Sequence, residues 1–200
     1  MLAREVMSSP VITVRRTDPV RQAVRLLHDL NITAAPVLDE DGRLAGIVSE
    51  LDLLTGEFEP DPRAHALPVQ GLGAPPPRVV GQVMTEQVMT VTEITDIATV
   101  VDLMIGKRFK SVPVLRGERI VGIISRRDLL ALLARTDRDL RRDIVQALRE
   151  QYPHGPRWTV TVHDGVAFLD GPADERARRV AEVITSTVPG VVRVEHRRNP

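Results

Sequence analysis

The chain of 200 residues carries 27 basic and 27 acidic side chains and no cysteine, so its formal net charge is zero. Zero net charge argues against an electrostatic grip of the whole chain on nucleic acid or anionic membrane, and the lack of cysteine excludes disulfides, thiolate metal sites and thiol catalysis. No apolar run is long enough to serve as a signal peptide or to span a bilayer. We therefore expect a soluble, cytoplasmic protein that does not bind nucleic acid.

One segment of the chain occurs twice. Residues 6–54 and 83–130 open with VMSSPVITV and VMTEQVMTV and end with GIVSELDLL and GIISRRDLL. A shift of 77 positions aligns Pro36 with Pro113, and a shift of 76 aligns Asp52 with Asp128, because one turn is a residue shorter in the second copy. Two copies of so long a unit indicate two similar domains that pack on each other rather than a solenoid.

Each copy is predicted to fold as β-α-β-β-α. In the first copy, the helix after the first strand has Asp18 as its expected N-cap and Pro19 in the first helical position, and its apolar residues keep helical spacing. The last helix opens at Ser49 or Ser125. The expected strands are residues 11–14, 36–38 and 44–48 in the first copy and 88–91, 113–115 and 120–124 in the second, with turns at 41–42 and 116–117.

The chain between and after the copies has a different character. Residues 56–78 are rich in proline and glycine and lack periodicity, which predicts a mobile linker rather than a lid over a ligand. From residue 136 onward the pattern predicts α-β-β-α-β. The expected parts are a helix capped by Asp137, strands at 158–163 and 166–169 joined by an Asp164-Gly165 turn, a helix capped by Asp174 or a neighbour, and a strand at 191–194.

The two copies carry a family resemblance. The pattern G-h-h-S-x-x-D, where h is apolar, occurs as Gly46–Asp52 and as Gly122–Asp128, each behind a Pro-Val strand. Residues 6–133 thereby resemble a tandem pair of CBS domains, which together form one Bateman module. The C-terminal segment resembles a BON domain through its Asp164-Gly165 hairpin and its Pro189-Gly190-Val191 ending.

The resemblance implies an α+β fold, in which two β-α-β-β-α CBS repeats pack as a pseudo-symmetric pair and a small α-β-β-α-β BON domain follows. The expected bounds are 1–55 for CBS repeat 1, 56–78 for the linker, 79–134 for CBS repeat 2 and 137–198 for the BON domain.

The same resemblance implies a non-catalytic regulatory module that binds AMP, ADP or ATP, or alternatively S-adenosylmethionine, in the cleft between the repeats. It further implies a homodimer whose BON domain contacts a phospholipid membrane or an unknown protein partner. The alternative from a different functional class is a ligand-free dimerisation scaffold that presents the BON domain.

The repeated motif suits an adenosyl ligand chemically. A strand that stops at Ser49 or Ser125 and turns into a helix aims backbone N–H groups and a hydroxyl at one point, which favours an anion. Asp52 or Asp128, one helical turn on, can accept both hydroxyls of a ribose. The simpler interpretation is that both serines are N-caps and both aspartates are first-turn acids stabilised by the helix dipole.

The second copy carries more positive charge near its motif than the first. Residues 107–110 hold three basic side chains ahead of Ser111, and Arg126 and Arg127 follow Ser125. We therefore expect the Asp128 site to take phosphorylated nucleotides and the Asp52 site to take an uncharged or cationic adenosyl group, or to stay empty. With the adenine slot that the family comparison adds, the expected ligand-binding residues are Thr13, Val14, Ala35, Pro36, Val37, Ser49, Asp52, Thr90, Val91, Lys110, Val112, Pro113, Val114, Ser125, Arg126, Arg127 and Asp128.

The sequence lacks recognisable motifs for catalysis and for metal binding. The five histidines are scattered without HExxH or H-x-H spacing, and there is no G-x-S-x-G elbow or Walker loop. The run at residues 71–73 precedes prolines rather than a helix, and Asp39–Gly42 is too short for a calcium loop. We predict that the protein is not an enzyme and holds no metal or cofactor.

Overall fold

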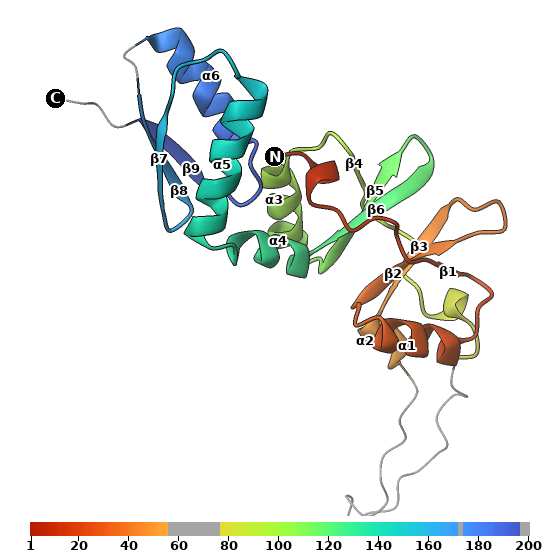
Figure 1. The fold of residues 1–200 in the computed structure, drawn as a ribbon. Helices are drawn as coiled ribbons and strands as arrows, with labels where there is room; N and C mark the ends of the chain where they lie inside the picture. The colour runs from red at the N-terminus through yellow and green to blue at the C-terminus, as the bar shows by residue number, and fades with distance from the viewer. Residues whose placement is uncertain (56–76, 172–173, 197–200) are drawn as a thin grey trace, which may run out of the picture. The chain divides into compact units, whose positions relative to one another are not determined.

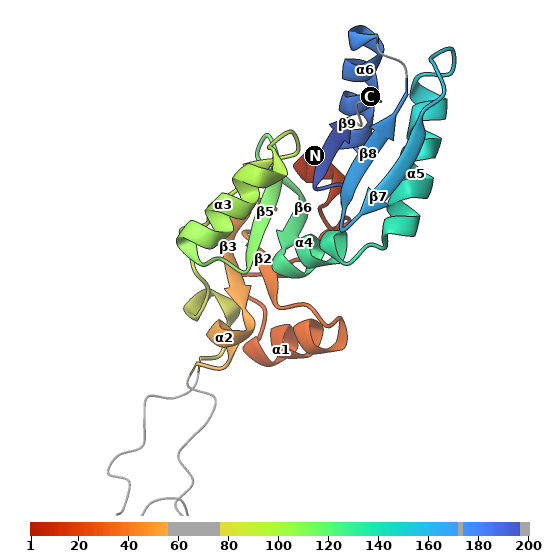
Figure 2. The same cartoon turned by 90° about the vertical axis from the view of Figure 1, so that its left-hand side faces the viewer.

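The computed structural model describes residues 1–55, 77–171 and 174–196 (Figures 1 and 2). The linker predicted at residues 56–78 lies outside the described residues except for its last two positions. Internal contacts divide the chain into two compact units, residues 8–93 with 100–124, and residues 1–7 with 94–99 and 125–200. Among the helices that the structure describes, none is both long and apolar enough to cross a bilayer.

The first repeat folds as β-α-β-β-α, as predicted. Its elements are β1 (Val14–Arg15), α1 (Val20–Asp29), β2 (Ala34–Leu38), β3 (Leu44–Ser49) and α2 (Glu50–Leu53). The sheet has the order β1-β2-β3, with β1 parallel and β3 antiparallel to β2. Gly42, at φ +77°, makes the turn between β2 and β3, a conformation that glycine adopts without a steric penalty.

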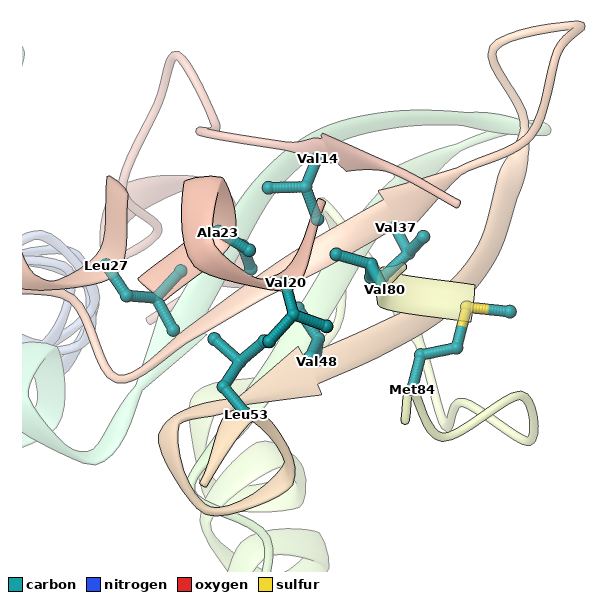
Figure 3. Packing of buried hydrophobic residues seen from close by; sticks show 10 residues of the cluster. Val14, Val20, Ala23, Leu27, Val37, Val48, Leu53, Val80 and Met84 are labelled. Carbon is teal, nitrogen blue, oxygen red and sulfur yellow. The ribbon is translucent and has the colours of Figure 1, made fainter. Parts of the chain in front are cut away.

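The core of the first repeat is built from aliphatic side chains. Helix α1 turns Val20 and Leu27 towards the sheet, where they meet alternate residues of β2 and β3 (Figure 3). Val80, in the short 3-10 helix η3 (Val80–Gln82), and Met84 complete this core. The residues that lead into the second repeat are therefore part of the core of the first.

The second repeat has the same order of elements. These are β4 (Val91–Thr92), α3 (Ile97–Lys107), β5 (Ser111–Arg116), β6 (Arg119–Ser125) and α4 (Arg126–Leu133). The sheet order is β4-β5-β6, and β4 runs parallel to β5. Val100 and Met104 of α3 are buried, as are Val112, Val114 and Ile124 of the sheet.

Two equivalent backbone bridges join the repeats within one compact unit. The amide of Ser8 donates to the carbonyl of Ile123 at 2.9 Å and the return bond is 3.2 Å, while Thr85 and Ile47 exchange two bonds of 2.9 Å. Ser8 and Thr85 occupy equivalent positions in the two repeats, and so do Ile47 and Ile123. Each repeat therefore pairs its lead-in segment with the last strand of the other, which is the pseudo-symmetry that the sequence predicted.

The C-terminal part folds as α-β-β-α-β, again as predicted. Its elements are α5 (Asp137–Gln151), β7 (Thr159–His163), β8 (Val166–Asp170), α6 (Glu175–Ser186) and β9 (Arg193–His196). Both helices contact the sheet β7-β8-β9 and each other, and one cluster of buried residues joins them (Figure 2). Among the described residues, the remaining short element is the 3-10 helix η1 (Ala3–Glu5), which belongs to the same compact unit.

Two of the predicted helix caps are wrong. The Asp18 carboxylate accepts a hydrogen bond from the Arg15 amide at 2.7 Å, and Pro19 is the N-cap of α1. The cap of α5 is Thr136, while the carboxylate of Asp137 accepts bonds from the amides of residues 164 and 165 at 3.0 Å each. Short carboxylate side chains bond to whichever amide lies nearest, so a tight turn outcompetes the helix end for each of them.

Candidate functional site

A cavity of about 210 Å³ lies beside the Ser49–Asp52 motif, within the unit that contains residues 8–93 and 100–124, and both repeats line it. The bridge between Ile47 and Thr85 brings the two repeats together at this point. The lining residues are Ala34, Ile47, Ser49 and Asp52 of the first repeat and Thr85, Gln87, Val88, Met89, Arg108, Phe109, Lys110 and Ser111 of the second. We call this cavity the Asp52 pocket.

A reciprocal set of hydrogen bonds fixes the carboxylate of Asp52. Its Oδ2 accepts from the Ser49 amide at 2.8 Å and from the Ser49 hydroxyl at 2.7 Å. The same hydroxyl lies 3.4 Å from the Asp52 amide, which completes a capping box at the start of α2. Among the described residues no donor reaches Oδ1 of Asp52, so one carboxylate oxygen remains available at the pocket wall.

The second motif has the same local geometry. Oδ2 of Asp128 accepts from the Ser125 amide at 2.7 Å and from its hydroxyl at 2.6 Å, and a capping box opens α4. The simpler interpretation of both serines, as N-caps, is thus confirmed for their hydrogen bonds. Because the amide and hydroxyl of Ser49 already bond to Asp52, the two groups expected to receive an anion there are engaged.

Two basic residues line the Asp52 pocket. Arg108 and Lys110 lie on the loop between α3 and β5, both are exposed, and both line the pocket that contains Asp52. The sequence led us to expect these side chains at the Asp128 site, whereas both line the pocket that contains Asp52. That expectation paired each basic loop with the motif of its own repeat. In the structure, the segment before the first strand of each repeat, which contains Ser8 or Thr85, pairs with the last strand of the other repeat.

Part of the pocket lining is apolar. Ile47, Val88 and Phe109 are partly buried, and the side chain of Met89 remains 48% exposed. A flexible thioether and a ring at the edge of a cavity offer adaptable apolar contact to a flat ligand. The lining of the Asp52 pocket therefore combines one fixed carboxylate, apolar side chains and two cationic residues.

The other expected ligand-binding residues occupy several places. Ser49, Asp52 and Lys110 line the pocket. Those in the strands that were expected to form an adenine slot are mainly core residues: Val14, Ala35, Pro36, Val37, Val112, Pro113 and Val114 are buried. Thr90 and Val91 are partly buried, Arg126 and Arg127 stand in the first turn of α4, and Thr13 lines a different hollow beside the two hairpin turns.

The alternation of side chains between the two faces of β3 could have identified Ile47 as a pocket residue, which the sequence prediction missed. Gly46 and Val48 face the core, so Ile47 and Ser49 must face the other way, which is where the pocket lies. No local pattern indicates the remaining lining residues. Thr85, Gln87 and Arg108 reach the pocket through the pairing of the two repeats, which is a long-range contact.

Helix α4 is joined at its other end to the C-terminal domain, within one compact unit. The Arg135 guanidinium donates to the carbonyl of Pro189 and pairs with the carboxylate of Asp143. The bond from Arg135 holds the pKa of the Asp143 carboxyl below its ordinary value. Gly190, at φ +95°, lies so close that a β-carbon there would stand 2.9 Å from the carbonyl oxygen of Leu132.

One group of possible metal ligands stands elsewhere in the described residues. Oxygen and nitrogen atoms of Asp137, His163 and Asp164 lie within 4.8 Å of one another. The Asp137 carboxylate already accepts two backbone amides, and the other two side chains are exposed. This arrangement describes a hairpin held to the start of α5, not a cation cage.

Known protein families match both repeats and the C-terminal segment. A family model described as CBS domain matches residues 3–58 and 80–135, and one described as BON domain matches residues 136–197. The two CBS matches cover more than half of the chain.

Similar proteins match the paired repeats. An A-adding tRNA nucleotidyltransferase from Geobacter sulfurreducens is 34% identical over 128 residues, which is 64% of this chain and 13% of that protein. An uncharacterized protein of Methanocaldococcus jannaschii, MJ1404, is 29% identical over 134 residues, 65% of this chain and 31% of its own. The chain thus spans less than a third of the length of these two relatives.

Solved structures show the same fold for this part of the chain. The CBS domain pair of protein MJ0100, in complex with 5′-methylthioadenosine and S-adenosyl-L-methionine, is 25% identical with a TM-score of 0.54, covering 66% of this chain and 94% of that one. The CBS domain of a CBS domain containing membrane protein from Sphaerobacter thermophilus is 28% identical with a TM-score of 0.52, covering 66% and 88%.

Proposed function

Because the chain belongs to the CBS domain family, with two CBS domains followed by a BON domain, we propose that it is a regulatory module that binds an adenosyl ligand in the Asp52 pocket. The observation that carries the proposal is the fixed carboxylate of Asp52 at an apolar cavity that both repeats line. The complex of the MJ0100 domain pair with two adenosyl compounds supports the same class of ligand.

Each part of the pocket has a role in this proposal. The free oxygen of Asp52 accepts a ribose hydroxyl, and because Ser49 holds the carboxylate in place, little side-chain entropy is lost on binding. Ile47, Met89 and Phe109 take the adenine ring against apolar surface. A ligand that contacts both repeats stabilises the arrangement in which they are paired, so binding shifts that equilibrium without any catalytic step.

Thermal unfolding with a ligand panel tests the proposal. The panel is 5′-methylthioadenosine, S-adenosylmethionine, AMP, ADP and ATP, with GTP as the base control. A ligand present at about a hundred times its Kd adds about 2.7 kcal/mol, which raises the Tm of a chain of this size by about 5–11 °C. Asp52→Asn should abolish the shift, while Asp128→Asn, which alters the matching capping box, should leave it. If no adenosyl compound raises the Tm of the wild type, the proposal is wrong.

A separate observation supports a second candidate function, the ligand-free dimerisation scaffold. Large apolar side chains stand exposed at two helices: Leu51 of α2 at 71% and Leu54, the C-cap of α2, at 51%, and Leu130 and Leu133 of α4 at 65% and 67%. Isolated exposed leucines are common, but pairs on one helix favour a protein contact. Light scattering of the purified chain measures this, and a dimer that Leu130→Glu with Leu133→Glu converts to monomer would support it.

The BON domain is proposed to provide attachment, either to a phospholipid surface or to a protein partner. Its α5 carries Arg138, Arg142 and Arg149 together with several acids, so its charge alone does not favour lipid. Co-sedimentation with anionic vesicles separates the two targets, because only lipid attachment brings the protein into the pellet.

A further inference from the structure

Strand β9 forms an open edge of the C-terminal sheet (Figure 2). The sheet order is β7-β8-β9, so among the described residues only β8 pairs with β9, and the other side of β9 has no neighbouring strand. Alternate residues of a strand direct their N–H and C=O groups to opposite sides, so part of the backbone of Arg193–His196 faces this edge. Such an edge is a template for pairing with another strand.

Apolar side chains accompany the open edge. Residues of α6 and β9 line a hollow of about 470 Å³, and Val183 and Val194 are among them. The side chain of Val183 is 59% exposed, and Val192, one residue before β9, is 64% exposed. A strand that pairs with β9 covers part of this surface, so the association combines backbone hydrogen bonds with burial of valine side chains.

The sequence of β9 suits pairing with a copy of itself. Arg193 and Glu195 stand on either side of Val194, share one face of the strand and are exposed. In an antiparallel pair with a two-fold axis through Val194, Arg193 of each copy lies opposite Glu195 of the other. A register centred one residue earlier or later places arginine opposite arginine or glutamate opposite glutamate.

The contact between these two side chains within one chain is weak. Nη1 of Arg193 and Oε1 of Glu195 lie 3.8 Å apart, and both groups are in contact with solvent. An exposed pair of this kind contributes little to stability, so a closer pair across two strands can replace it.

We propose that β9 pairs antiparallel with β9 of a second copy, centred on Val194, and joins the two C-terminal sheets into one. Opposite charges directly across an antiparallel pair stabilise it and like charges destabilise it, so the two pairs of Arg193 with Glu195 fix the register. The backbone bonds and the covered valines supply the attraction. This interface is separate from the Asp52 pocket and from the exposed leucines at α2 and α4, and so goes beyond the functions proposed above.

Disulfide trapping in the full chain tests the register. The chain has no cysteine, so Val194→Cys introduces a single thiol at the proposed axis. Residues directly opposite in an antiparallel pair have Cα atoms about 4.5–5.5 Å apart, which a disulfide can bridge. Val192→Cys is the matched control, because Val192 is more exposed but the proposed pairing sets its two copies about 13 Å apart along the strands. On mild oxidation we expect Val194→Cys to form linked dimers at least about tenfold faster.

Charge reversal tests the complementarity of the two strands. In the Val194→Cys chain, Arg193→Glu or Glu195→Arg alone places like charges opposite each other and should slow cross-linking about tenfold or more. A mixture of the two reversed chains places opposite charges at both positions again, so cross-linking between them should return. Rescue in the mixture also shows that each reversed chain is folded.

Three results would overturn the proposal. If Val192→Cys cross-links as fast as Val194→Cys, the contact is collisional or has another register. If the reversed chains cross-link at the rate of their parent, the charges do not face each other. If the mixture stays as slow as each reversed chain alone, the pairing of Arg193 with Glu195 across the axis is wrong.

Discussion

Replacing Gly190 by alanine should destabilise the joint between α4 and the BON domain. The residue has φ +95°, where an alanine is strained by about 1–2 kcal/mol. Its new β-carbon would lie 2.9 Å from the carbonyl oxygen of Leu132 and 3.0 Å from Cδ2 of Leu140. Relief of such overpacking costs about 1–3 kcal/mol, so the free energy of unfolding should fall by about 2–5 kcal/mol in total.

The matched control is Gly165→Ala in the same domain. Gly165 has φ +75°, but the nearest atom to its β-carbon is a methyl of Val192 at 3.0 Å, which can move more easily than a backbone carbonyl. It should lose only the strain, about 1–2 kcal/mol. The difference between the two variants therefore isolates the contact with α4.

Urea unfolding followed by tryptophan fluorescence measures both variants. Trp158 is the single tryptophan of the chain, and it packs on the core of the BON domain, so the signal reports that domain. The free energy is taken from the linear dependence on urea. A Gly190→Ala protein that loses no more stability than Gly165→Ala would refute the tight contact between Gly190 and Leu132.

Two further predictions concern hydrogen-bonded carboxylates. Ser49→Ala and Ser125→Ala each remove a capping box and should lower the free energy of unfolding by about 1 kcal/mol, which calorimetry measures. The control Ser186→Ala, at an exposed site on α6, should change this free energy by less than about 0.5 kcal/mol. The pKa of Asp143 is lowered in the folded state, so its pairing with Arg135 stabilises the protein above the unfolded pKa of about 3.9 and is lost as pH falls through the folded value. Urea unfolding between about pH 3 and 7 should thus show the advantage of the wild type over Asp143→Asn shrinking below about pH 4, and an advantage that stays constant would contradict this account.

The elements of this fold could be predicted because their signals are local. Apolar residues at helical spacing in α1 and alternation in β3 follow from the period of each element, and Asp174 does cap α6 through the amide of Ala177. The caps at Asp18 and Asp137 were wrong because a short carboxylate has several amides within reach.

The site was harder to predict than the fold. Asp52 and Ser49 were identified by their repeated motif, and they do line a pocket. The sequence analysis placed Arg108 at the Asp128 site, whereas it lines the pocket of Asp52, and its position depends on which repeat pairs with the last strand of which sheet. That is a matter of long-range pairing, and residues next to each other in sequence hold no signal for it.

The shared core of the first repeat has a consequence for synthesis of the chain. Val80 and Met84 fill that core, although they follow the first repeat in sequence, so residues 1–55 alone cannot bury it. On a ribosome the first repeat has to wait until Met84 has emerged. The bridge between Ser8 and Ile123 forms later still. Ile123 is synthesised roughly 40 residues after Met84, which takes about 2–8 s at ordinary rates of elongation. The boundary between the repeats in sequence is therefore not a boundary between folding units, and a fragment cut there would expose apolar surface and aggregate.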